Sequence, residues 1–313
     1  MECVRALTIA VSALVLATAA AATTVRTVRA PGVVEALAFD GGRIAYASGP
    51  GAGDCDRVRI WSPRTRSIVR LGRTTPCVET STGTGIAAIA IAGRRVLWLH
   101  YTGGNIREWA LFTATETARA PRRLRFVSRD VDAPAPIVVG DGDTSRQGDV
   151  LPYAVDRQVI ALRSDGSRRF AWTAPARVVA LSALAGEVAV ALEGGKVTVL
   201  DLAGRIVAQQ SYAGEITAVR LTGTGIVVQR GRTLEFRGAS TASTATLPAG
   251  ARLVDAAGAT DAVYVLRNAV YVRRIASARD VLIGHGALAQ VEGLWLATAS
   301  GRTVTALEPF TDR

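Results

Sequence analysis

The chain has 313 residues, of which 49% are hydrophobic, and its 37 basic and 26 acidic side chains give a formal net charge of +11. Only two histidines are present, which leaves little scope for catalytic triads or histidine-based metal chemistry. The excess of arginine favours anionic partners. The arginines are also spread along the whole chain, as expected for ordinary surface cations.

The first 22 residues predict a secretory signal peptide. Arg5 precedes an uncharged run, Ala6 to Ala22, which ends in small residues, and this order is typical of export signals. The alternative is an uncleaved anchor helix, for which the run is short and weakly apolar. Cleavage near Ala22 leaves residues 23–313 as one extracytoplasmic domain, secreted or at the cell surface, with no membrane span.

The rest of the chain repeats one pattern, in which short apolar segments are separated by glycine-centred turns with a period of about 40 residues. We expect the innermost strands of successive units to start near Val34, Ile86, Ile137, Val178, Ile216, Leu253 and Leu288. Their spacing shortens toward the C-terminus, so the extra loop length lies in the first three units. Loops on a rigid scaffold usually carry the binding groups, and we expect a site there.

The unit from Val178 to Gly214 shows the pattern most clearly. Within Glu187–Leu192, valine and leucine alternate with alanine, so both faces of the expected strand are apolar. A strand with one solvated face would alternate apolar with polar residues instead. Gly194 and Gly195 supply the turn to the next strand. Such a sheet requires a neighbour on each face, which predicts an all-β, seven-bladed β-propeller of four-stranded antiparallel blades.

The seventh unit lacks one strand, because the chain ends after apolar segments near Leu288, Leu294 and Val304. The segment Thr24–Arg29 has the alternation of an edge strand and belongs to no unit. We expect it to complete the last blade, which would close the ring and cover both open edges.

Two segments resemble known repeats. Val159–Gly166, followed by Phe170 and Trp172, is similar to the PQQ-like propeller repeat, and Val199–Gly204 is similar to its first part. The units as a whole resemble β-propeller repeats of the PQQ-like and WD-repeat type. This resemblance covers almost all of residues 23–313 and implies the propeller fold.

Cys55 and Cys77 are predicted to form a disulfide. They are the only cysteines after the signal peptide, and exported proteins commonly contain disulfides. Cys55 falls in the loop between the second and third strands of its unit, and Cys77 in the link to the next unit. Both segments lie on the same face of a propeller. A metal pair and free thiols are the alternatives.

A recognition surface is predicted on that face, because aromatic side chains supply much of the binding energy at interfaces. The tryptophans in this set are equally suited to packing between blades. The candidate residues are Asp54, Asp56, Trp61, His100, Tyr101, Asn105 and Trp109.

The segment 141–149 has a weak resemblance to a calcium-binding loop, because oxygen-bearing side chains occur at alternate positions. The alternative is a solvated turn, since Arg146 stands where the tight-turn glycine belongs and no glutamate follows at the twelfth position. The candidate ligands are Asp141, Asp143, Ser145 and Asp149. No other cofactor is expected.

These features predict a secreted, monomeric binding or scaffold module without catalytic activity. Its expected partner is a protein or an anionic cell-envelope polymer, and not a nucleic acid, because the chain carries an export signal. The alternative is an extracytoplasmic hydrolase or lyase that uses carboxylates at the central channel, such as Asp130 with Asp132 or Asp54 with Asp56, with or without Ca²⁺. A deep axial pocket with several convergent acids would favour the enzyme.

Overall fold

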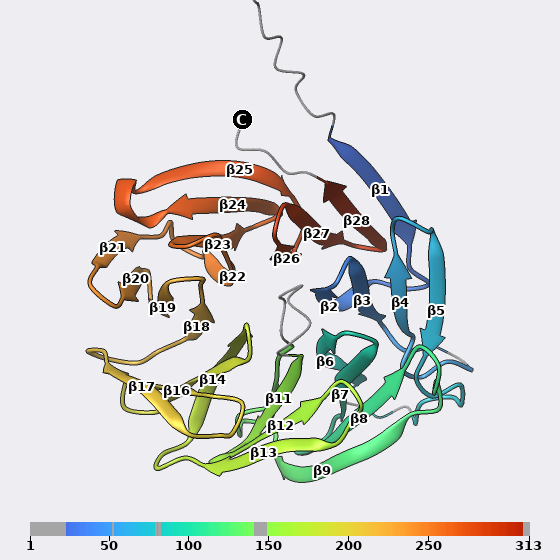
Figure 1. Cartoon of the computed structure of the whole chain (residues 1–313). Helices are drawn as coiled ribbons and strands as arrows, with labels where there is room; N and C mark the ends of the chain where they lie inside the picture. The colour runs from blue at the N-terminus through green and yellow to red at the C-terminus, as the bar shows by residue number, and fades with distance from the viewer. Residues whose placement is uncertain (1–22, 52, 79, 81–82, 141–148, 309–313) are drawn as a thin grey trace, which may run out of the picture.

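Figure 1 shows the computed structural model, which describes residues 23–51, 53–78, 80, 83–140 and 149–308. Within these ranges, seven four-stranded antiparallel sheets are arranged as blades around one axis. The seven-bladed propeller predicted from the repeats is therefore confirmed. The predicted signal peptide lies outside the described residues.

In the first six blades, the first strand in the chain lies nearest the axis and the fourth lies at the rim. The first three blades consist of β2 (Val34–Asp40), β3 (Arg43–Ser48), β4 (Val58–Ser62) and β5 (Ser67–Leu71); β6 (Thr84–Ala92), β7 (Arg95–Thr102), β8 (Ile106–Thr115) and β9 (Arg122–Asp130); and β10 (Ile137–Val138), β11 (Val150–Val155), β12 (Gln158–Arg163) and β13 (Arg168–Thr173).

The remaining blades follow the same order, except that the last one takes its outermost strand from the N-terminus. They consist of β14 (Val178–Leu184), β15 (Glu187–Leu192), β16 (Lys196–Leu200) and β17 (Ile206–Ser211); β18 (Ala218–Leu221), β19 (Gly225–Arg230), β20 (Thr233–Gly238) and β21 (Ala242–Thr246); β22 (Arg252–Ala257), β23 (Asp261–Leu266), β24 (Ala269–Arg274) and β25 (Arg279–His285); and β26 (Leu288–Glu292), β27 (Trp295–Ser300), β28 (Thr303–Glu308) and β1 (Thr24–Arg29). A 3-10 helix, η1 (Ile275–Ser277), joins β24 to β25. No helix in the described ranges is long and apolar enough to span a bilayer.

Every innermost strand starts within two residues of the position expected from the repeats. A fourth strand was expected in the second blade, but the sequence did not locate the rim strand β9, because arginines interrupt its apolar positions. At a rim only part of the strand is buried, so a hydrophobic pattern is weak there.

The N-terminal strand closes the ring as predicted. β1 pairs antiparallel with β28, with Thr24 opposite Glu308 and Arg29 opposite Thr303. Val28 packs against the apolar cluster between the last and first blades. The last blade thus contains both ends of the described chain, and its pairing hides two edges that would otherwise be open.

The core lies between blades rather than inside one layer. Val188 and Val190 of β15 pack toward the third blade. Ala189 and Ala191 on the opposite face pack toward the fifth. The alternation of large and small apolar residues is thus explained by a neighbour on each side, as predicted. Gly195, with φ of 83°, makes the turn after β15, where an added Cβ would lie 2.4 Å from the Tyr212 carbonyl oxygen.

Candidate functional site

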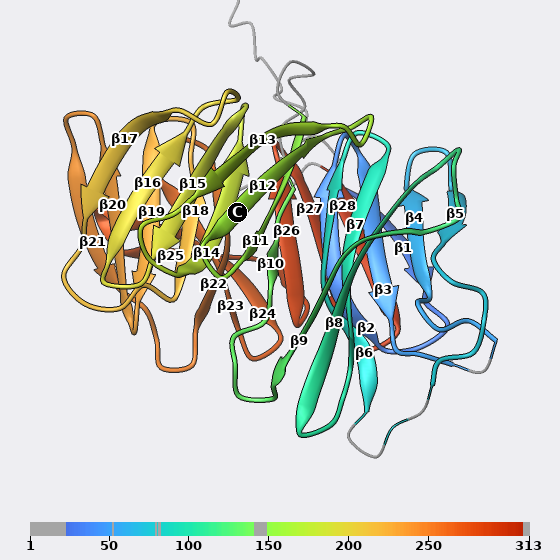
Figure 2. The same cartoon turned by 90° about the horizontal axis from the view of Figure 1, so that it is seen from below.

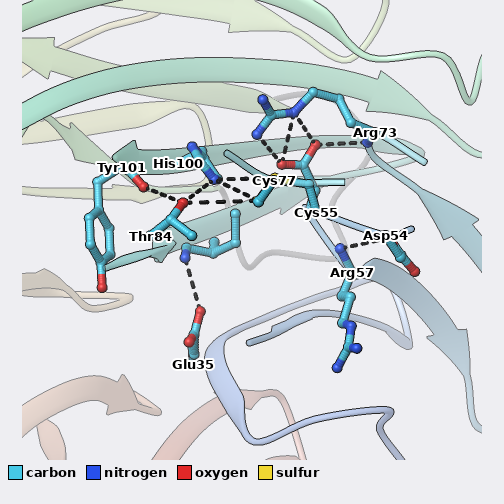
Figure 3. The surroundings of a disulfide bond; sticks show 11 residues. Glu35, Asp54, Cys55, Arg57, Arg73, Cys77, Thr84, His100 and Tyr101 are labelled. Carbon is cyan, nitrogen blue, oxygen red and sulfur yellow. Dashed lines mark hydrogen bonds and ion pairs between the residues drawn. A yellow bond between two sulfur atoms is a disulfide. The ribbon is translucent and has the colours of Figure 1, made fainter. Parts of the chain in front are cut away.

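A disulfide between Cys55 and Cys77 joins two loops of the first two blades (Figure 3). Cys55 lies between β3 and β4, and Cys77 lies between β5 and β6, with their Cα atoms 4.6 Å apart. Cys55 is buried, and its N–H donates to the Thr75 carbonyl at 3.1 Å. Cys77 is half-buried within an exposed segment. The predicted disulfide is present.

His100, on the neighbouring strand β7, points at this disulfide. Its Nε2 lies 3.6 Å from both sulphur atoms and 3.0 Å from Thr84 Oγ1. The ring is 4% exposed. Burial and, to a lesser extent, the positive charge of Arg73 lower the pKa of His100 to about 4, against an opposing effect of Asp56. The imidazole is therefore neutral at pH 7.

Two carboxylates next to Cys55 are bound by arginines. Asp56 is fully buried, and Arg73 reaches it through Nε at 3.0 Å, Nη2 at 2.6 Å and its own backbone N–H at 2.8 Å. Asp54 lies 3.2 Å from the guanidinium nitrogens of both Arg59 and Arg70. Such charge-assisted, multidentate pairs hold loops in place. Both carboxylates therefore have structural partners within the chain.

The two tryptophans of the predicted recognition surface are buried, and Tyr101 is half-buried, so the expectation of exposed tryptophans is corrected. Trp61 is 3% exposed and packs between the last and first blades. Trp109 is 5% exposed, packs between the second and third blades, and contacts Tyr101 at a ring distance of 5.7 Å. Asn105 is exposed in the turn before β8. Large aromatic rings bury more apolar area between blades than at the surface. The alternative prediction, that these tryptophans pack between blades, is therefore the one that the structure supports.

Of the predicted calcium ligands, the structure describes only one. Asp141, Asp143 and Ser145 lie outside the described residues. Asp149 is half-buried directly before β11, and burial raises the pKa of its carboxyl group, against opposing effects of Ser164 and Arg43.

A cavity of about 610 Å³ runs along the axis and is lined by the innermost strands. Its charged side chains are Glu35, Arg220, Arg252, Asp255 and Glu292. Burial raises the pKa of Glu35 and of Asp255 and lowers the pKa of Arg220.

Side chains around this axis form hydrogen bonds between blades, and the described bonds run in one direction. In seven of them, a side-chain oxygen on one blade accepts a backbone N–H from the next blade, at 2.5–2.9 Å. The pairs are Glu35 with Ile86, Asp40 with Gly93, Ser182 with Leu221, Gln229 with Leu253, Asp255 with Val291, Gln290 with Phe39, and Glu292 with Gly41. These bonds link consecutive blades near the axis, where the strands converge.

Three acids among the described residues line the cavity, and each of them accepts a backbone N–H. Glu35, Asp255 and Glu292 each bind backbone at a different junction between blades. Asp130 ends the rim strand β9 and is exposed, as is Asp132, so this pair does not face the axis. The described acids of the cavity thus take part in hydrogen bonds between blades.

The rim strand β9 (Figure 2) carries four arginines, Arg122, Arg123, Arg125 and Arg129. Arg122, Arg123 and Arg125 are exposed, and no carboxylate in the described ranges forms an ion pair with them. Phe126 is 46% exposed beneath Arg123, with 5.5 Å between the guanidinium carbon and the ring centre. A surface groove of about 400 Å³ adjoins this strand, lined by Arg125, Val155, Asp156, Arg157, Gln158 and Thr173.

The protein is thus a β-propeller with two loops joined by a disulfide and with an arginine-rich rim strand, β9. No family model matches the chain, and no curated protein matches its sequence. Solved structures share the fold at low identity. Raptor from Chaetomium thermophilum matches with a TM-score of 0.57 and 11% identity over 92% of this chain and 28% of that one.

Two further structures match over nearly their full length. A chain of the mitotic checkpoint complex has a TM-score of 0.57 and 13% identity over 92% of this chain and 95% of its own. A catalytically inactive virginiamycin B lyase from Staphylococcus aureus, with quinupristin, has a TM-score of 0.53 and 10% identity over 91% of this chain and 99% of its own. At these identities the likeness shows the fold alone.

Proposed function

We propose that this protein is an extracytoplasmic, non-catalytic binding module that recognises an acidic, extended protein segment along the rim strand β9. The observation that carries this proposal is a nine-residue edge strand with three exposed arginines that have no acidic partner in the described ranges. The disulfide and the signal-like N-terminus support the extracytoplasmic location.

The edge of β9 suits an extended segment. Its inner side pairs with β8, so its outer side offers backbone N–H and C=O groups to another strand. Arginines on an edge oppose pairing with a second copy of the same strand, because like charges would face each other. A segment with alternating carboxylates would instead be attracted. Phe126 adds an apolar contact beside these charges.

The groove next to β9 extends this surface toward the third blade. Arg125 and Arg157 line it together with Asp156. Asp156 is paired with Arg129 at 3.0 Å. Its negative charge is therefore compensated, and the groove retains a positive balance. An anionic polymer without a strand-forming backbone would share the charge attraction but not the edge pairing.

The test is binding of a fluorescent peptide with alternating glutamate and threonine, measured by anisotropy. Charge reversal in Arg122→Glu/Arg125→Glu should weaken binding by about 10-fold or more, since each exposed ion pair contributes roughly 0.2–1 kcal/mol and reversal adds repulsion. The matched control is Arg267→Glu/Arg279→Glu, which makes the same change in net charge at the sixth blade.

Equal loss in both double variants would show that only net charge matters and would overturn the β9 site. A second peptide, in which proline replaces each threonine, keeps the charge but removes the backbone donors needed for edge pairing. Equal affinity for both peptides would overturn recognition of an extended strand. Tighter binding of an acidic polysaccharide than of either peptide would assign the surface to an envelope polymer.

A further inference from the structure

We propose that the reduced form of this protein binds Zn²⁺ through Cys55 Sγ, Cys77 Sγ and His100 Nε2, so that the disulfide and the zinc-bound thiolates are alternative closures of the same loop pair. These three side chains come from two loops and one strand of adjacent blades. Their ligand atoms all lie within 4.8 Å of one another. Cysteine and histidine are the ligands that Zn²⁺ prefers in proteins.

The distances to the histidine already match a tetrahedral site. Zinc bonds of about 2.3 Å to sulphur and about 2.0 Å to nitrogen place S and N about 3.5 Å apart at tetrahedral angles. His100 Nε2 lies 3.6 Å from each sulphur. Only the separation of the two sulphurs must change, from about 2.05 Å when bonded to about 3.8 Å around zinc. Cys77 lies in a loop segment whose neighbours are exposed, so rotation of its side chain accommodates this change.

A fourth position adjoins the three ligands. Thr84 Oγ1 lies 3.0 Å from His100 Nε2 and 4.0 Å from Cys77 Sγ, and it donates to the Tyr101 carbonyl at 2.9 Å (Figure 3). A water molecule held by this hydroxyl would complete four-coordination there. Groups outside the direct ligands orient them and tune the affinity. Thr84 is therefore expected to act as a positioning residue.

A dithiol can reduce the disulfide and so convert the oxidised form into the zinc-binding form. One thiolate of the dithiol attacks Cys77 Sγ, the S–S bond breaks, and its electron pair goes to Cys55 Sγ, which takes a proton. The second dithiol sulphur then displaces Cys77 as a thiolate, and the reductant leaves as a cyclic disulfide. Zn²⁺ binds the two thiolates and the neutral imidazole, and the remaining thiol proton is released to water. The accessible sulphur is that of Cys77, since Cys55 is buried.

The test uses the full chain with Cys3→Ser, reduced with a dithiol and freed of it under argon. Titration with Co²⁺ should give thiolate charge-transfer absorption at one equivalent, and Zn²⁺ should displace the cobalt. His100→Gln should weaken binding by at least about 100-fold, since even outer partners of a metal site are worth 10–100-fold. His285→Gln is the matched control, because His285 is exposed on β25, and its affinity should equal that of the parent chain. The oxidised chain should show no cobalt absorption.

Absent cobalt absorption in the reduced chain, or equal loss in both histidine variants, would overturn the site. Thermal unfolding tests the site even if reduction loosens the loops. Zn²⁺ should raise the melting temperature of the reduced chain and leave the melting temperature of Cys55→Ser/Cys77→Ser unchanged. No rise in the reduced chain, or an equal rise in both proteins, would also overturn it. Thr84→Val should retain binding with about 10-fold lower affinity.

Discussion

The buried histidine beside the disulfide makes a quantitative prediction about stability and pH. Burial, together with the charge of Arg73, lowers the pKa of His100 from 6.5 to about 4 in the folded chain. In the unfolded chain the imidazole titrates near 6.5, so between these values the unfolded state binds a proton that the folded state does not. The free energy of unfolding is therefore fully retained above pH 6.5 and decreases as the pH falls toward 4.

The size of the effect follows from the two pKa values. Between pH 7.5 and pH 5.0, preferential protonation of the unfolded chain removes about 2 kcal/mol of stability. The ring is 4% exposed, so solvent screening reduces this value little. For a chain of 313 residues, the usual unfolding entropy converts this loss of stability into roughly 3 °C of melting temperature.

The perturbation is His100→Gln, which keeps a polar side chain near Thr84 and removes the titration. Urea unfolding of the oxidised protein with chelator, at pH 7.5 and pH 5.0, gives the free energies. The wild-type chain should lose about 2 kcal/mol more than the variant over this interval. Carboxylates that titrate in the same range contribute equally to both proteins and cancel. His285→Gln should keep the wild-type dependence. Parallel pH profiles of the wild type and His100→Gln would refute the assignment of a buried, neutral imidazole.

Two further predictions concern closure of the ring. Val28→Asp places a charge against the apolar cluster between the last and first blades and should lower the free energy of unfolding, measured in urea, by about 2 kcal/mol. Val25→Asp, at a 58% exposed position of the same strand, should change it by no more than about 0.5 kcal/mol. Equal costs would contradict closure by β1. Asp255→Ala leaves the Val291 N–H without its acceptor and should cost about 1–3 kcal/mol, while Asp132→Ala at an exposed position should cost little. No difference between these two would show that the bond between blades adds no stability.

The repeat and the closure of the ring could be predicted from local sequence. The alternation in Glu187–Leu192 makes both faces of the strand apolar, so the strand requires a packing neighbour on each face, whichever segments supply it. The position of Thr24–Arg29 outside the units followed from the same pattern. The Cys55–Cys77 pair was predictable because blade topology alone places their two loops on one face.

The site depended on contacts that no local pattern encodes. Sequence treated Trp61 and Trp109 as possible surface residues, but whether a ring is exposed depends on the blade that packs against it. The arginines of β9 interrupt its apolar pattern, so the sequence did not show this strand, which is formed by hydrogen bonds to β8. A rim strand buries too little apolar area to show a strong period.

The sequence by itself determined the number of blades, their closure and the disulfide, because strand periodicity and turn chemistry act over a few residues and repeat. Only the tertiary structure decided that His100 meets both sulphurs, that the axial carboxylates bind backbone of the next blade, and that the arginines of β9 share one exposed edge. These features arise between segments that are distant in the chain. Their distances, burial and charge environment exist only once the ring has closed.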